Sequence, residues 1–189
     1  GLVMLMLASG WAMASMTTSP LLVASVQMAV SVPAFVFGIP LGIMTDRFGH
    51  RRLLLIAQFA MLIPECGLAL IAWQGLLTPW LLLAALVVIG VGLVIHSAAW
   101  KPLLCAMYPG EQLVAALSLN SLGTKSGKVV APALGGYLTG LAGLALILAL
   151  RVIAHVTVIR AVWRVPSHFH SESQESGSTA TSRQALGAG

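Results

Sequence analysis

Long apolar stretches, most of them near twenty residues, recur along this chain and place the strongest limit on its fold. They cover residues 21–44, 53–73, 79–100, 113–137 and 141–162, after a shorter opening run over residues 1–14. A helix of about 20 apolar residues crosses the hydrocarbon core of a bilayer. We therefore expect an all-α membrane protein in contact with lipid, with a six-transmembrane-helix bundle over residues 1–164. The opening run is too short to cross, so the first helix is expected to be truncated.

The composition agrees with this expectation. Apolar residues make up 58% of the 189 positions and charged residues only 8%, too few to cover the surface of a soluble domain. No basic segment precedes the opening run, so a signal peptide is a poor interpretation. After Pro166 the chain is rich in Ser, Thr, Gly, Gln and His, and we expect residues 165–189 to form a polar disordered tail or an interdomain linker.

The charged and reactive residues exclude several functions. The net charge is +5, but the ten Lys and Arg are scattered singly or in pairs, so no nucleic-acid partner is expected. Cys66 and Cys105 lie far apart without metal-ligand spacing, so no metal and no cofactor are expected. No carboxylate pair, Ser-His-Asp arrangement or phosphate loop is present, so the chain is not expected to be an enzyme.

The basic residues of the connections all fall on one side of the predicted spans. One side has Arg47, Arg51, Arg52, Lys101, Arg160 and Arg164. The opposite connections, residues 15–20, 74–78 and 138–142, contain no Lys or Arg. By the positive-inside rule, both ends of the chain are expected to face the cytoplasm.

The loop after the second span reads Gly-Ile-Met-Thr-Asp-Arg-Phe-Gly-His-Arg-Arg over residues 42–52. It resembles the signature loop of the major facilitator superfamily, with His50 where a third Lys or Arg is usual. The matching positions are Gly42, Asp46, Arg47, Gly49, Arg51 and Arg52. Asp46 is expected at the carboxyl end of the second span and Arg51 at the amino end of the third. The helix dipole disfavours each charge at that position, so both side chains are expected to have other partners. The resemblance implies that Asp46 and Arg47 form a cytoplasmic latch between two transporter halves. Gly38 and Gly42 are expected to allow close helix packing.

Residues 127–136 are similar to the fifth-helix motif of exporters in this superfamily. The matching positions are Gly127, Ala131, Pro132, Gly135 and Gly136, with Ala131 in place of a glycine. Similar residues elsewhere along the chain indicate a resemblance to the subgroup of enterobactin exporters and so-called transmembrane secretion effectors. The resemblance covers residues 1–164, the N-terminal half of a twelve-helix fold, and so implies a missing C-terminal half. It also implies alternating access, a small-molecule substrate of drug-like or siderophore-like character, protons as coupling ion, and the bacterial cytoplasmic (inner) membrane.

The fifth span carries a polar face. Asn120, Ser121, Thr124, Lys125 and Lys128 fall within an arc of about 140°, beside a ridge of small residues, Gly123, Gly127 and Ala131. Lysines are unfavourable in lipid, so we expect Asn120, Thr124, Lys125 and Lys128 to line a water-filled cavity or meet acidic partners. The alternative is a helix that begins later, with both lysines reaching the cytoplasmic surface.

Two further charges lie inside predicted spans. Glu65 is near the middle of the third span and Arg151 near the middle of the sixth, with His155 one turn beyond. Such residues are functional candidates, and proton coupling and a structural hydrogen bond both stay open. The resemblance places these two helices at the periphery, away from the transport cavity. His96 is interpreted as a helix-packing residue.

The expected function is that of a proton-coupled exporter of small molecules, present here as a fragment. The alternative is a non-transporting truncated remnant, or a six-helix membrane protein that acts as a dimer. No motif identifies the substrate.

Overall fold

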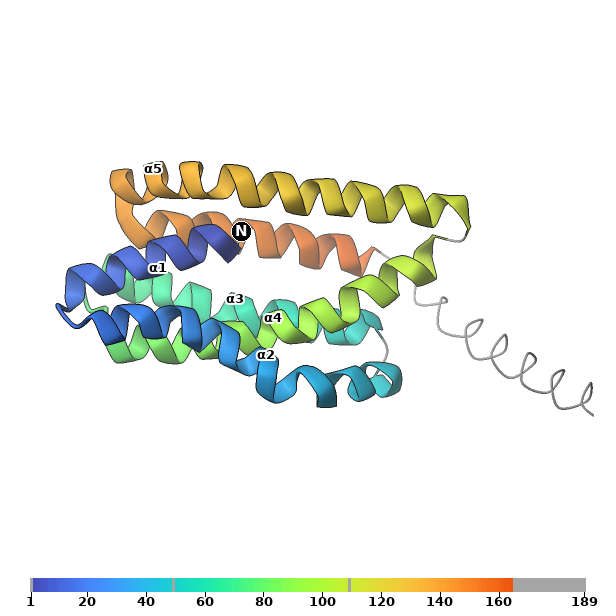
Figure 1. The fold of residues 1–189 in the computed structure, drawn as a ribbon, viewed down its shortest axis with the longest axis horizontal. Coiled ribbons are helices and arrows are strands. Elements are labelled where there is room, and N and C mark those ends of the chain that lie inside the picture. The colour runs from blue at the N-terminus through green and yellow to red at the C-terminus, as the bar shows by residue number, and fades with distance from the viewer. Residues whose placement is uncertain (1, 49, 109, 165–189) are drawn as a thin grey trace, which may run out of the picture.

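The computed structural model describes residues 2–48, 50–108 and 110–164. Its helices are α1 (Leu2–Met16), α2 (Pro20–Phe48), α3 (His50–Trp73), α4 (Pro79–Met107) and α5 (Glu111–Trp163). They lie roughly parallel or antiparallel to one another in one bundle (Figure 1). The described residues contain no strand, and the prediction of an all-α bundle is confirmed.

α5 consists of two antiparallel limbs. The chain reverses its direction near Gly143, whose φ is 66° (Figure 1). Glycine adopts this left-handed conformation readily because it has no Cβ. We call residues 111–142 the first limb and Gly143–Trp163 the second limb. With α1 to α4 they make six helical segments, as the sequence predicted.

Several helices extend beyond the apolar runs from which they were predicted. α2 continues to Phe48 and α4 continues to Met107. Backbone hydrogen bonding can continue past the point at which the sequence becomes polar, so hydropathy marks the membrane-crossing part of a helix and not its end. The start of α4 does follow local sequence: Thr78 accepts a hydrogen bond from the Leu81 amide at 3.4 Å, and Pro79 occupies the first turn.

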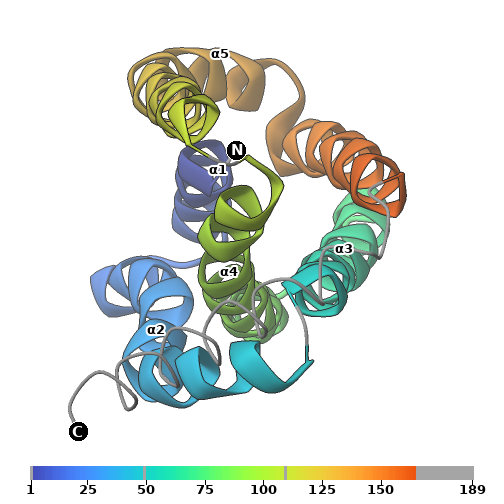
Figure 2. The same cartoon turned by 90° about the vertical axis from the view of Figure 1, so that its right-hand side faces the viewer.

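α4 lies at the centre of the bundle, between α2 and α3 (Figure 2). Its buried residues Leu82, Leu86 and Ile89 join those of α1, α2 and α5 in the main apolar core. Two glycines permit the close approach of its neighbours. A Cβ on Gly90 would lie 2.7 Å from the carbonyl oxygen of Val30 in α2, and one on Gly92 would lie 2.7 Å from a side-chain carbon of Met61 in α3.

The outer surface is apolar and suits a bilayer. Among the described residues, the helical stretches long and apolar enough to cross a membrane are Pro20–Gly38, His50–Trp73, Pro79–Cys105 and Gly143–Trp163, while α1 is apolar but shorter. Trp73, Trp80 and Trp163 are exposed at helix ends, where tryptophan favours the membrane–water interface. By length and composition, these helices are those of an integral membrane protein.

Basic residues gather at one end of the bundle. α3 begins there with Arg51 and Arg52, α4 ends there beyond Lys101, and α5 ends there (Figure 1). The Nη2 of Arg51 donates to the carbonyl oxygen of Trp163 at 3.1 Å, which joins the start of α3 to the end of α5. At the opposite end, residues 17–19, residues 74–78 and the turn at Gly143 contain no Lys or Arg.

Candidate functional site

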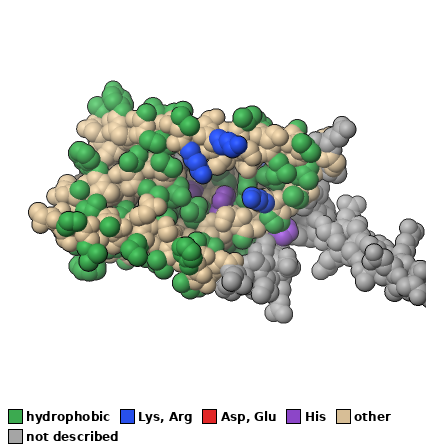
Figure 3. Space-filling view, viewed as in Figure 1, with side chains coloured by type: hydrophobic (Ala, Val, Ile, Leu, Met, Phe, Trp, Pro, Cys, Tyr) green, Lys and Arg blue, Asp and Glu red, His purple; other side chains and the backbone are tan. Residues whose placement is uncertain are grey.

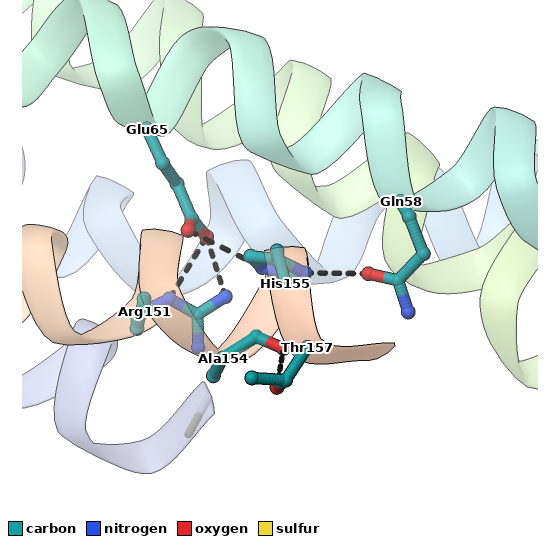
Figure 4. Close-up of polar contacts among 6 residues, drawn as sticks. All are labelled: Gln58, Glu65, Arg151, Ala154, His155 and Thr157. Atoms are coloured by element: carbon teal, nitrogen blue, oxygen red, sulfur yellow. Dashed lines mark hydrogen bonds and ion pairs between the residues drawn. The ribbon is translucent and has the colours of Figure 1, made fainter. Parts of the chain in front are cut away.

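A cluster of polar side chains is enclosed between α3 and the second limb of α5 (Figure 4). Glu65 has a fully buried side chain, and Arg151 holds it through two donors. Arg151 Nε lies 2.8 Å and Nη2 2.5 Å from the same oxygen, Glu65 Oε1. A buried charge is tolerated when it is paired and hydrogen-bonded, and this geometry meets both conditions for the carboxylate.

His155 extends the cluster to a second residue of α3. Its Nε2 lies 3.2 Å from the other carboxylate oxygen, Glu65 Oε2, within ion-pair distance but without hydrogen-bond alignment. Its Nδ1 lies 2.5 Å from Gln58 Oε1. The imidazole therefore bridges Gln58 and Glu65, both of them buried (Figure 4).

Sequence reasoning named part of this cluster and missed the rest. It singled out Glu65 and Arg151, noted His155 as a neighbour, and overlooked Gln58. A signal was present, because Gln58 and Glu65 are seven residues apart and Arg151 and His155 are four apart, spacings that place each pair on one face of its helix. No sequence signal joined the two faces, since that pairing depends on how α5 folds back at Gly143.

The polar face of the first limb is partly engaged. Asn120 Oδ1 accepts a hydrogen bond from Trp100 Nε1 of α4 at 3.1 Å, and Thr124 Oγ1 donates to the Asn120 carbonyl at 2.7 Å. Lys125 and Lys128 are exposed, but so is every residue from 121 to 130. Burial within this chain therefore does not separate the predicted polar face from the rest of the helix.

Two hollows flank this face. One, of about 540 Å³, lies between α4 and the first limb and is lined by Trp100, Tyr108, Gln112 and Asn120 among others. The other, of about 390 Å³, is lined by Val114, Ser118, Ser121 and Lys125 among others. Figure 3 shows Lys, Arg and His side chains gathered in the middle of one face of the bundle, with no acidic side chain of a described residue among them.

The exporter-type motif in the first limb packs at some positions and not at others. Ala131 is buried, and a Cβ on Gly135 would lie 3.3 Å from the Met4 side chain of α1. Gly127 and Gly136 have no atom within 4 Å of an added Cβ, and Pro132 lies inside the helix. No described residue of this chain packs against Gly127 or Gly123, so the predicted close packing of this ridge stays a prediction. Small residues permit close packing only where a neighbouring helix reaches them.

Much of the signature loop lies outside what the structure describes. Gly42, Asp46 and Arg47 fall in the last turns of α2, but their side chains are outside the described part of the chain, as is Gly49. Arg51 and Arg52 are in the first turn of α3. Arg51 finds its partner at the carboxyl end of α5, where a cation is favourable to the helix dipole. Gly38 is exposed and has no atom within 4 Å of an added Cβ, so its packing role stays a prediction.

The His96 ring stacks on Trp100, one turn further along the same helix, with centroids 5.7 Å apart. Its role in packing between helices stays a prediction. The thiols of Cys66 and Cys105 are free. Within the described residues, no group of three His, Cys, Asp or Glu side chains is placed to hold a metal ion.

A helical membrane bundle with this signature loop has the character of a major facilitator superfamily transporter, and comparison with known proteins agrees. The chain belongs to the transmembrane secretion effector family, which matches residues 1–185. The prediction that it is a transporter-type protein and not an enzyme is thereby confirmed.

Two similar proteins carry the name macrolide efflux protein A. The one from Streptococcus pyogenes is 24% identical over 154 residues, which cover 79% of this chain and 38% of that protein. The one from Enterococcus faecalis is 24% identical over 149 residues, covering 77% of this chain and 46% of that protein. The chain thus matches less than half the length of either relative. No solved structure matches the chain significantly.

Proposed function

We propose that this chain is the amino-terminal half of an exporter that moves small molecules out across the bacterial cytoplasmic membrane by alternating access, with protons as the coupling ion. The observation that carries the proposal is the match of the whole bundle to a family of transmembrane secretion effectors. Two relatives named as efflux proteins favour export over import. In alternating access, two bundles rock about a site between them.

The basic end of the bundle supports a cytoplasmic location for both ends of the chain. The polar residues of the first limb, Asn120, Thr124, Lys125 and Lys128, are proposed to line the cavity between this half and the other. Lys125 and Lys128 make this wall of the proposed cavity electropositive, which suits substrates with an anionic group. The latch role of Asp46 and Arg47 remains part of this proposal.

The chain by itself is expected to insert into membranes without exporting anything, because only one wall of the central site is present. The experiment reconstitutes the polypeptide in liposomes, imposes a pH gradient, and follows a radiolabelled macrolide and an anionic dye. The same chain without a gradient is the control.

Robust gradient-driven export by the chain alone would contradict the half-transporter proposal. It would favour the dimer of six-helix units instead. Export that appears only when the coding sequence continues into further spans would support the proposal.

A further inference from the structure

With the Gln58 amide turned as the structure shows it, the hydrogen-bonding capacity of the buried cluster balances only when His155 carries a proton on both ring nitrogens. Arg151 satisfies Glu65 Oε1 with two N–H donors. Gln58 presents its carbonyl oxygen to His155 Nδ1, so Nδ1 must carry a hydrogen. A neutral imidazole protonated at Nδ1 has a lone pair at Nε2, and that lone pair would face the lone pairs of Glu65 Oε2 at 3.2 Å.

A second proton on the imidazole removes this conflict. When both nitrogens carry hydrogen, Nδ1 donates to Gln58 and Nε2 faces the carboxylate as a cation. Arg151 keeps Glu65 ionised, so the imidazole and not the carboxylate takes up the proton. We propose that Glu65, His155 and Gln58 form a proton-binding site between α3 and the second limb of α5.

The same three residues can release the proton without leaving a polar group unsatisfied. The proton on Nδ1 departs to water, and its electron pair stays on the nitrogen. The Gln58 amide then turns by about 180° and donates its N–H₂ group to Nδ1, while Nε2–H still faces Glu65. The cluster thereby changes its net charge from +1 to 0, counting Glu65, Arg151 and His155.

Of the two groups, Glu65 and His155, only His155 can be reached from outside the bundle. Its side chain is 12% exposed, whereas that of Glu65 is 0% exposed. Among the elements packed around it, α4 contributes His96, which is close enough to act on His155 electrostatically, and α1 contributes no titratable side chain. The charges acting directly on His155 are therefore those of Glu65 and Arg151, with His96 as a further titratable neighbour.

This inference rests on the proposed function, because it assigns the residue that carries the coupling proton, but its test needs no transport. The polypeptide is labelled with ¹⁵N-histidine, placed in lipid nanodiscs and titrated by NMR. The signal of His155 is identified by its loss in His155→Gln, and His50 at the end of the bundle serves as an internal reference. In the parent chain, we expect His155 to be doubly protonated at low pH and to lose one proton, from Nδ1, as the pH is raised.

Two variants should change the ratio of charged to neutral His155 in opposite directions. Glu65→Gln combined with Arg151→Gln removes both fixed charges while keeping polar partners, and the ratio of charged to neutral His155 at a given pH should fall about tenfold or more. Gln58→Glu supplies an acceptor that cannot become a donor when ionised, and the same ratio should rise about tenfold or more. A purely structural bridge would be weakened in both variants without these opposite shifts.

The proposal is overturned if His155 stays singly protonated from pH 5 to pH 9 in the parent chain, or if the two variants shift it in the same direction. Export by the full-length transporter with no titration at His155 would refute the proton site and leave the proposed function standing. Titration as expected, with no export by the full-length transporter, would refute the proposed function and leave the proton site standing.

Discussion

Arg51 and Arg151 show two uses of the same side chain. Arg151 is nearly buried and directs two donors at one carboxylate oxygen in the bundle interior. Arg51 reaches the carbonyl oxygen of Trp163 at the end of α5 and adds a cation where the helix dipole is negative. The planar fork of the guanidinium serves the first role in a way that a single ammonium group could not.

Lys128 provides a test of where the first limb meets water. We expect Lys128→Cys to react with a membrane-impermeant thiol reagent in the full-length transporter, in a background with Cys66→Ser and Cys105→Ser. Val130→Cys, turned by about 200° on the helix, should react far less because it would face lipid or protein.

This comparison is well matched because neither position is buried in this chain, so steric access alone does not separate them. Equal labelling of the two positions would mean that this segment lies in water on all sides, as in a helix that enters the membrane later.

At the scale of helices, packing depends on a few close approaches around α4. Gly90 lies against the backbone of α2, and Gly92 against α3. In a membrane, helices associate through close packing and not through the hydrophobic effect, so small residues at crossings matter more than the apolar surface around them.

Gly90→Ala should therefore destabilise the bundle. The new methyl group would lie 2.7 Å from the Val30 carbonyl oxygen, and a backbone atom cannot move aside as a flexible side chain can. We expect a loss of about 1–3 kcal/mol, measured by denaturant unfolding in mixed micelles. Gly67→Ala in α3 is the control, since its Cβ would meet no atom within 4 Å and alanine favours a helix. Equal stability of the two variants would show that α2 and α4 do not approach as closely as described.

At the scale of the whole molecule, charge divides the bundle into two unlike ends. The start of α3, the end of α4 and the end of α5 carry the basic residues, and the opposite end carries none among residues 17–19, 74–78 and the turn at Gly143. We expect a bundle with this asymmetry to insert with its basic end toward the cytoplasm.

The orientation can be measured with single cysteines in the same Cys-free background. Thr78→Cys, between α3 and α4, should react with an impermeant reagent added to intact spheroplasts. Lys101→Cys, near the other end of α4, should react only in inside-out vesicles. The reverse pattern would place both chain ends outside the cell and would contradict the proposed topology.

The sequence by itself determined the all-α class, the superfamily, and which connections between spans carry the basic residues. The physical reason is that the length of an apolar run, the connection in which a charge lies and a short loop motif are local properties. They can be read without knowing how the helices pack. The same local pattern named Glu65 and Arg151 as unusual, because a charge in an apolar run is visible in one dimension.

Only the tertiary structure decided which residues are partners. The chain reverses at Gly143, brings the second limb of α5 against α3, and so joins Arg151 and His155 to Glu65 and Gln58, 86 and 97 residues away. It likewise decided that Gly90 and Gly135 pack closely. Hydropathy and spacing describe one helix at a time, whereas an ion pair or a close crossing is a property of two helices and of the loop geometry that orients them.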